Sequence, residues 1–247
     1  MDLGLTGRTA IVCGASSGIG LAIAEALVAE GANVAMFARR RDVLEREAER
    51  LGALAVRGDV AVPADLERLV ERTVAAFGGV DIVINNSGGP APGPAAGISE
   101  EQIEAAIALL LHSAVRLTNL CLPLLEQSGR GRIVNIESSA VREPIDNLVL
   151  SNMTRAAVVA WAKTLSREVG PRGITVNTIA TGKIDTDRLR SLYTPEQFAK
   201  LGQDIPVGRA GRPSELADLV CFLASDRAAY ISGTLIPVDG GLSRGLL

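Results

Sequence analysis

Residues 9–20 read TAIVCGASSGIG, and this stretch decides the fold. Its first five residues are small, apolar or β-branched, which is typical of a buried strand. Glycines then follow with the spacing G-x-x-x-G-x-G, ahead of an apolar helical pattern. Glycine lets the backbone turn tightly and approach a phosphate, and the helix N-terminus attracts the phosphate charge. This strand–turn–helix predicts a dinucleotide-binding unit.

The rest of the chain alternates short β-branched runs with longer helical patterns. We expect strands over 9–13, 33–38, 54–57, 81–85, 132–136, 175–179 and 235–238, and helices over 20–30, 41–51, 63–77, 100–127, 148–169 and 213–223. Strands separated by helices favour right-handed crossovers and parallel pairing. The sequence therefore predicts one α/β domain over residues 1–247, with a Rossmann-type doubly wound parallel sheet of about seven strands and helices on both faces.

Composition narrows the class of protein. Apolar residues make up 47% and aromatic residues 3%, which suits parallel strands buried on both faces. The net charge of −3 gives no global attraction to nucleic acid or to anionic membranes. No apolar stretch approaches the ~20 residues of a membrane span, and the N-terminus has no signal-peptide pattern. The three cysteines lie apart in apolar segments, so we interpret them as core residues. We expect a cytoplasmic protein without a metal, nucleic-acid or membrane partner.

The end of the second predicted strand indicates which dinucleotide binds. An acidic residue there would hold the adenosine ribose and favour NAD, whereas arginine accommodates the 2′-phosphate of NADP. Ala38 holds the acidic position, and Arg39, Arg40 and Arg41 follow it. Cations at a helix N-terminus oppose the helix dipole, so a merely solvated helix start leaves their placement unexplained. The sequence favours NADP(H) over NAD(H).

Further motifs make the chain resemble the short-chain dehydrogenase/reductase family from residue 5 to about residue 242, and most of all its 3-oxoacyl-acyl-carrier-protein reductases. NNSG at 85–88 is similar to the family's N-N-A-G, IVNIESS at 133–139 to its I-V-N-I-S-S, and TGKIDT at 181–186 to its P-G-x-I-x-T. Together with the glycine turn and the arginines, the resemblance implies a cofactor site of Gly14, Ser16, Ser17, Gly18, Ile19, Gly20, Arg39, Arg40, Asp59, Val60, Asn86, Ser87, Gly88, Arg155, Ile184 and Thr186. For Asp59, a cap ahead of the helix at 63–77 is the alternative.

The resemblance places the family's catalytic serine at Ser138, while its tyrosine and lysine positions hold Ser151 and Arg155. Tyrosine and lysine one helical turn apart share a face, where the ammonium lowers the pKa of the phenol. A serine hydroxyl is a much weaker acid, and arginine does not release its proton. The family's asparagine aligns with Leu110. Ser138, Ser151 and Arg155 are therefore the candidate catalytic residues, with the role of orienting the substrate.

Other titratable side chains are expected to have structural or solvated roles. His112 lies about 200° around its helix from Leu110 and should point away from the site, toward a helix interface. Glu137 should point to the side of its strand opposite Ser138. The loop residues Glu143, Asp146 and Tyr193 can approach a nicotinamide, but the sequence gives no further reason to place them there.

Residues 183–212 are polar and contain two prolines, which predicts a substrate lid. Four arginines make this segment basic and suit either a phosphopantetheine or acyl-carrier partner or a solvated surface. The helical stretch 156–162 is apolar nearly all round. Because the sheet can cover only one side of that helix, we expect a homodimer or a homotetramer.

Two functions remain open. The first is an NAD(P)H-dependent oxidoreductase that acts on a carbonyl or secondary alcohol of a small molecule or acyl thioester, with an atypical proton relay. The alternative is a non-catalytic NADP(H)-binding pseudoenzyme that serves as a partner subunit or sensor. The replaced tyrosine and lysine fit both functions, and the intact cofactor features favour a role that uses the ligand.

Overall fold

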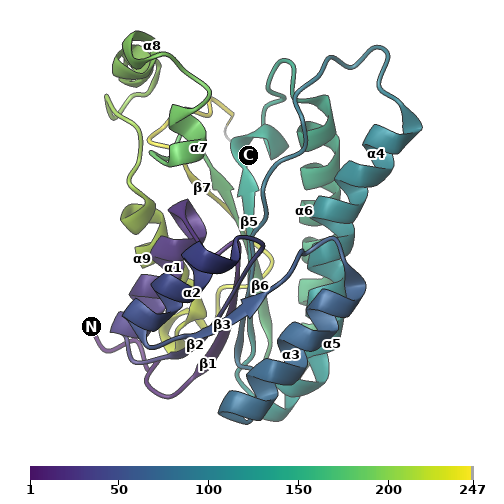
Figure 1. Ribbon diagram of the computed structural model, residues 1–247, viewed down its shortest axis with the longest axis vertical. Helices are drawn as coiled ribbons and strands as arrows, with labels where there is room; N and C mark the ends of the chain where they lie inside the picture. The colour runs from purple at the N-terminus through teal and green to yellow at the C-terminus, as the bar shows by residue number, and fades with distance from the viewer. Residues whose placement is uncertain (246–247) are drawn as a thin grey trace.

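Seven strands form one parallel sheet in the order β3-β2-β1-β4-β5-β6-β7 (Figure 1). The computed structural model describes residues 1–245. The strands are β1 Thr9–Cys13, β2 Asn33–Ala38, β3 Leu54–Arg57, β4 Ile82–Asn85, β5 Arg132–Ser138, β6 Thr175–Thr181 and β7 Leu235–Val238. The chain builds outward from β1 to β3 and then returns to place β4 beside β1. This reversal is the switch point at which doubly wound sheets bind ligands, and the predicted fold class is confirmed.

Helices cover both faces of the sheet (Figure 1). They are α1 Gly18–Ala29, α2 Arg41–Leu51, α3 Pro63–Phe77, α4 Glu100–Ile107, α5 Ser113–Ser128, α6 Val149–Val169, α7 Asp187–Arg190, α8 Pro195–Lys200 and α9 Pro213–Ala224. Helices α1, α2 and α9 pack on one face, and α3, α5 and α6 pack on the other. The short helices α7 and α8 lie beyond the carboxyl ends of the strands (Figure 1).

The sheet separates two apolar layers. Along β1, Ala10 and Val12 pack into the α1/α9 layer, whereas Ile11 and Cys13 pack into the α3/α5/α6 layer. This alternation follows from the two-residue period of a strand, and it explains why both kinds of position are apolar. The cysteines are buried and free as expected, and burial raises the pKa of the Cys13 thiol to about 12. Among residues 1–245, no three His, Cys, Asp or Glu side chains group as metal ligands.

The helical region predicted over 100–127 is interrupted by a π-helical turn, Ala108–His112, between α4 and α5. A π turn leaves carbonyl groups displaced from their usual partners. The Ser113 hydroxyl donates to the carbonyls of Leu109, at 2.6 Å, and Leu110, at 3.1 Å. No local signal in the sequence marks this turn. Leu110 lies within this turn, and its buried side chain lines a small cavity beside the candidate site.

The same region corrects the expectation that no apolar stretch approaches membrane-span length. The helix from Glu100 to Ser128 is long and apolar enough, by length and composition alone, to cross a membrane. Its inner side chains, including Leu117, Cys121 and Leu125, are buried in the core layer. The helix also packs against α3 and α6. Because 39% of its most apolar stretch is buried, packing in this layer accounts for part of its composition.

Candidate functional site

A cavity of about 460 Å³ opens at the carboxyl ends of β1, β2, β3 and β4. Its volume is typical of a small-molecule or cofactor site. The lining residues are Gly14, Ser16, Ser17, Gly18, Ile19, Gly20, Phe37, Ala38, Arg39, Arg40, Gly58, Asp59, Val60, Asn86, Ser87, Gly88, Gly89, Leu109, Thr186, Asp187 and Arg188. All the predicted cofactor residues except Arg155 and Ile184 therefore lie around one space.

The turn between β1 and α1 accepts only glycine at its tightest points. A Cβ atom at Gly20 would lie 2.3 Å from the carbonyl oxygen of Gly14. Gly14 itself has φ +64°, and a Cβ there would lie 2.7 Å from Nδ2 of Asn86. That amide donates to the carbonyl of Cys13 at 3.1 Å, which ties the loop after β4 to the end of β1. The turn thus keeps open a cradle that side chains would fill.

The first turn of α1 lacks a side-chain cap. Ser17 is the N-cap residue, but its hydroxyl makes no capping hydrogen bond. It accepts instead from Nη2 of Arg40 at 2.9 Å. The unpaired amides and the helix dipole at such a terminus attract phosphate. The cradle, its amides and an adjacent guanidinium group fit the pyrophosphate of a dinucleotide.

The end of β2 carries cations and no acid. Ala38 ends the strand, and Arg39 and Arg40 follow it into the cavity. Arg39 is 75% exposed, and its Nη1 lies 3.8 Å from the carboxylate of Asp59. An exposed, loose ion pair of this kind has little energetic effect, so Arg39 stays open to a ligand. Two cations and no acidic residue therefore follow directly after the end of β2 on the cavity wall.

Asp59 does not cap α3, so the alternative interpretation of this residue is wrong. The N-cap of α3 is Val62. Asp59 Oδ1 instead accepts from the amide of Ala61 at 3.0 Å, which makes a local turn. This turn closes the loop after β3 and leaves Asp59 on the cavity wall.

Two serine hydroxyls and one guanidinium group form the catalytic side of the candidate site. Ser138 ends β5, and its Oγ accepts from the amide of Ala140 at 3.2 Å. Ser151 lies in the first turn of α6, and Arg155 lies one turn later. Nε of Arg155 donates to Oγ of Ser151 at 3.0 Å. Each serine oxygen thus already accepts a hydrogen bond, so its own proton is free for a further acceptor.

Arg155 turns toward β5, where it meets Glu137. Its Nη1 lies 2.7 Å from Oε2 of Glu137 and 3.4 Å from the carbonyl oxygen of Ile136. The two charged side chains are only 10% and 6% exposed. Burial raises the pKa of Glu137, and the positive charge of Arg155 opposes that rise. Strand alternation does not separate Glu137 from the candidate catalytic residues, because Arg155 reaches from α6 to Glu137 and also bonds Ser151.

This ion pair also explains why Arg155 does not line the cofactor cavity. Two of its donor groups are committed to Glu137 and Ser151. Ile184 is outside the lining for another reason: it is buried, and its backbone pairs with Gly211. The sequence held a signal for the ion pair, since an acid stands in an otherwise apolar strand beside Ser138 and a cation stands in an apolar helix.

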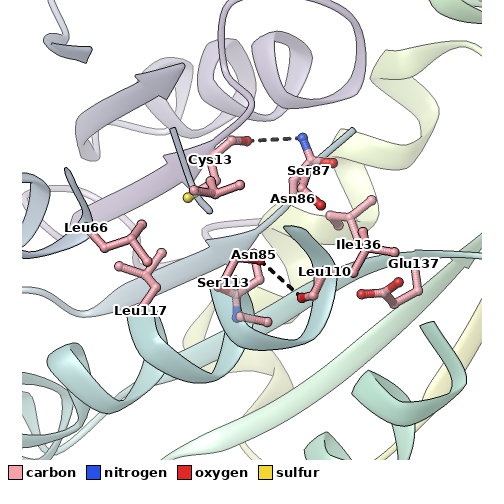
Figure 2. Close-up of a pocket in the computed structure, with 12 residues that line it drawn as sticks. Cys13, Leu66, Asn85, Asn86, Ser87, Leu110, Ser113, Leu117, Ile136 and Glu137 are labelled. Carbon is pink, nitrogen blue, oxygen red and sulfur yellow. Dashed lines mark hydrogen bonds between the residues drawn. The ribbon is translucent and has the colours of Figure 1, made fainter. Parts of the chain in front are cut away.

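Leu110 and Glu137 share a second, much smaller space with Ser113, Asn85 and Asn86 (Figure 2). Its volume of about 10 Å³ approximates that of one water molecule. Leu110 is 3% exposed and presents an apolar side chain to this space. Glu137 is the one acid that lines it. Among the residues that line this small cavity, the only carboxyl group is therefore that of Glu137, which is paired with Arg155.

The remaining candidates from the sequence lie away from both cavities. His112 is exposed, its ring contacts Arg116 at 3.4 Å, and it lines neither cavity, as expected; within residues 1–245 its exposure shows that it is not packed at a helix interface. Glu143 accepts from the backbone amides of Arg244 and Gly245. Neither Asp146 nor Tyr193 lines the described cavities.

The two ends of segment 183–212 are joined by backbone pairing. The amide of Gly211 donates to the carbonyl of Lys183 at 3.0 Å, and the amide of Asp185 donates to that of Gly211 at 2.8 Å. Between them, Thr186 caps α7 through its hydroxyl and would contact a Cβ atom at Gly18. The segment is thus a closed loop anchored beside the glycine turn, and it brings Arg188 to the cavity wall.

Comparison with known proteins gives the family. The family described as Enoyl-(Acyl carrier protein) reductase matches residues 14–243. The chain is 37% identical to the 3-oxoacyl-[acyl-carrier-protein] reductase FabG of Escherichia coli (strain K12) over 238 residues, which cover 96% of this chain and 97% of the relative. The L-sorbose reductase of Gluconobacter frateurii, solved with NADPH and L-sorbose, is 34% identical with a TM-score of 0.95 and full coverage of both chains. YwfH, an NADPH-dependent reductase involved in bacilysin biosynthesis, is 29% identical with a TM-score of 0.93 and coverage of 97% and 99%. The chain belongs to the short-chain dehydrogenase/reductase family.

Proposed function

We propose that the protein is an NADP(H)-dependent oxidoreductase that interconverts a carbonyl and a secondary alcohol. The observation that carries this proposal is the single cavity in which the glycine cradle and the Arg39–Arg40 cations lie together. Two solved relatives, the L-sorbose reductase and YwfH, are NADPH-dependent or NADPH-bound. The family relationship supports the same class of chemistry.

The cofactor would lie along the cavity from β2 toward β5. Its pyrophosphate would rest on the first turn of α1, between Gly14 and Gly20, and its 2′-phosphate beside Arg39 and Arg40. Asp59 and Val60 would contact the adenine, while Asn86, Ser87 and Gly88 would border the ribose. Ile184 and Thr186 would hold the nicotinamide end. When bound, the cofactor supplies the hydride.

We further propose that Ser151 and Arg155 replace the tyrosine and lysine of the family, and that Leu110 replaces its asparagine. Ser138 and Ser151 would donate hydrogen bonds to the carbonyl oxygen, because both oxygens already accept from Ala140 and Arg155. Donors fixed in advance stabilise the negative charge that develops on such an oxygen. Arg155 would keep Ser151 oriented, and solvent water would supply the proton. The relay would be atypical, because Ser138 and Ser151 would stabilise the negative charge on the carbonyl oxygen without themselves supplying the proton.

The substrate would be a small molecule or acyl thioester, covered by the 183–212 lid. We also propose that the protein is a homodimer or homotetramer. Along α6, the outward side chains of Met153, Ala156 and Ala160 are exposed in the single chain. A second subunit that covers this apolar face would complete the helix layer.

The test is NADPH fluorescence titration followed by NADPH oxidation with 3-oxoacyl thioesters, diones and quinones. Binding together with turnover of at least one member supports the proposal. Tight binding without turnover of any member would instead identify a pseudoenzyme that acts as a partner subunit or sensor. A lack of NADPH binding would contradict both functions.

The double variant Arg39→Gln/Arg40→Gln is expected to raise the Kd for NADPH about 10²- to 10⁴-fold, while the Kd for NADH changes less than twofold. Each charged hydrogen bond contributes ~1.5–3 kcal/mol, and ~1.4 kcal/mol corresponds to a tenfold change in affinity. Fluorescence titration with both cofactors gives the two constants. Arg46→Gln is the matched control, since this exposed arginine of α2 pairs with Glu47 outside the cavity. Equal losses for both cofactors would place these cations at the pyrophosphate instead.

A further inference from the structure

Two guanidinium groups approach one point beside Gly89. A Cβ atom built on Gly89 would lie 2.8 Å from Nη2 of Arg188 and 3.8 Å from Nη2 of Arg155. Arg188 comes from α7 and lines the cofactor cavity, whereas Arg155 comes from α6 and bonds Ser151. The absence of a side chain at Gly89 leaves room for both cations. Arg188, on the wall of the cofactor cavity, and Arg155, beside Ser151, therefore approach the same residue.

The positive charge at this point is only partly compensated. Glu137 pairs with Arg155. For Arg188, the described part of the chain offers no carboxylate within 4 Å, and its one hydrogen-bond partner is the Gly89 carbonyl at 3.5 Å. In the same segment, Arg190 pairs with Asp185 and Arg209 pairs with Glu215. Arg188 thus differs from its neighbours, and it leaves one net positive charge facing the site.

We propose that Arg188 binds an anionic group of the substrate, a carboxylate held close to the reacting carbonyl, in the space that it shares with Arg155. This inference rests on the proposed function. A planar guanidinium group matches a carboxylate through two parallel hydrogen bonds. The Nη2 atom of Arg155, which is not used by Glu137 or Ser151, provides a second donor on the same side. The preferred substrate is then an oxo acid, in which the carboxylate and the carbonyl are part of one small molecule.

The cofactor's pyrophosphate is the other anion that Arg188 can reach from the cavity wall. The geometry favours the substrate, because the first turn of α1 already offers its own uncapped amides to a pyrophosphate. Arg188 instead faces Arg155, whose Nε holds the catalytic-side Ser151. The two anions can be distinguished by experiment. An Arg188 variant would lose affinity for NADPH if the anion is the pyrophosphate, and would lose its preference for an acidic substrate if the anion is the substrate's carboxylate.

The experiment compares a 3-oxo acid with its methyl ester in the NADPH-saturated protein, for the wild type and Arg188→Met. We expect the wild type to favour the acid in kcat/KM. We expect Arg188→Met to lower kcat/KM for the acid about 10- to 100-fold, the range for one charged hydrogen bond. The value for the ester and the Kd for NADPH should change less than twofold. Arg190→Met is the control on the same helix, and the acid-to-ester ratio should remain that of the wild type.

An unchanged acid-to-ester ratio in Arg188→Met would overturn the inference. So would a loss of NADPH affinity with the ratio unchanged, which would assign Arg188 to the cofactor. If neither compound is reduced, the proposed function fails with these substrates, and the thermal shift produced by each compound still tests the anion site. Stabilisation of the wild type, but not of Arg188→Met, by the acid alone would then support the site. No stabilisation by the acid would contradict it.

Discussion

Arg155→Met is expected to lower the free energy of unfolding by about 3–5 kcal/mol, because it leaves the Glu137 carboxylate buried without its partner. Both side chains are almost fully enclosed, and their closest N–O distance is 2.7 Å. For a chain of this size, the loss corresponds to a fall in Tm of roughly 6–20 °C. Urea denaturation followed by circular dichroism measures it.

The matched control is the double variant Glu137→Leu/Arg155→Met. Replacing both members of a buried ion pair by apolar side chains of similar size is often close to neutral, so most of the lost stability should return. A double variant as unstable as Arg155→Met alone would show that the arginine acts through packing and not through its charge.

The destabilisation should also depend on pH. In Arg155→Met, burial still raises the pKa of Glu137, and the positive charge that opposed the rise is gone. The folded state then holds the Glu137 proton more tightly than the unfolded chain does, so stability is lost as pH rises above the ordinary range of carboxyl pKa values. The deficit in Tm relative to the wild type should therefore be smaller at pH 5 than at pH 8. A deficit that does not change with pH would contradict a buried, unpaired carboxyl group.

Ser138→Ala and Ser151→Ala are each expected to lower kcat about 10²- to 10³-fold, the usual effect of removing one donor to a developing oxyanion. The Kd for NADPH should not change, since neither serine lines the cofactor cavity. Single-turnover oxidation of bound NADPH measures the chemical step directly.

Ser139→Ala is the control, because this neighbouring serine is also buried but none of the described side-chain hydrogen bonds involves its hydroxyl. Its kcat should stay within twofold of the wild type. If Ser151→Ala retains the wild-type kcat while Ser138→Ala does not, Ser151 is not a donor and Arg155 orients the site by some other contact.

Local sequence was enough to predict the features that depend on neighbouring residues. The spacing of Gly14, Gly18 and Gly20 predicted the open turn between β1 and α1. The arginines after Ala38 predicted the positive charge on the wall of the cavity. The apolar runs and helical periods predicted the strands and helices of a parallel sheet, because strands buried on both faces are continuously apolar. The order of the strands was not predicted. Even the contact of Arg40 with Ser17 follows from both residues lying at the carboxyl edge of adjacent strands.

Contacts between distant segments could not be predicted in the same way. Glu137 meets Arg155 only after α6 packs beside β5, and alternation along the strand alone suggested a role apart from the site. Arg188 meets Gly89 across 99 residues of chain, through the closed loop of 183–212. The π turn at 108–112 has no periodic signature, yet it contains Leu110, which lines the small cavity beside Glu137. These three features border the candidate catalytic residues.

Transfer of deuterium from NADPH labelled at C4 tests the central claim most directly. The labelled cofactor, prepared with the isotope on each face in turn, is incubated with the protein and the carbonyl panel, and the products are analysed by mass spectrometry. We predict an alcohol with one deuterium at the former carbonyl carbon, transferred from one of the two faces only. Binding of NADPH without deuterium in any product would contradict the account and leave a nucleotide-binding protein without dehydrogenase activity.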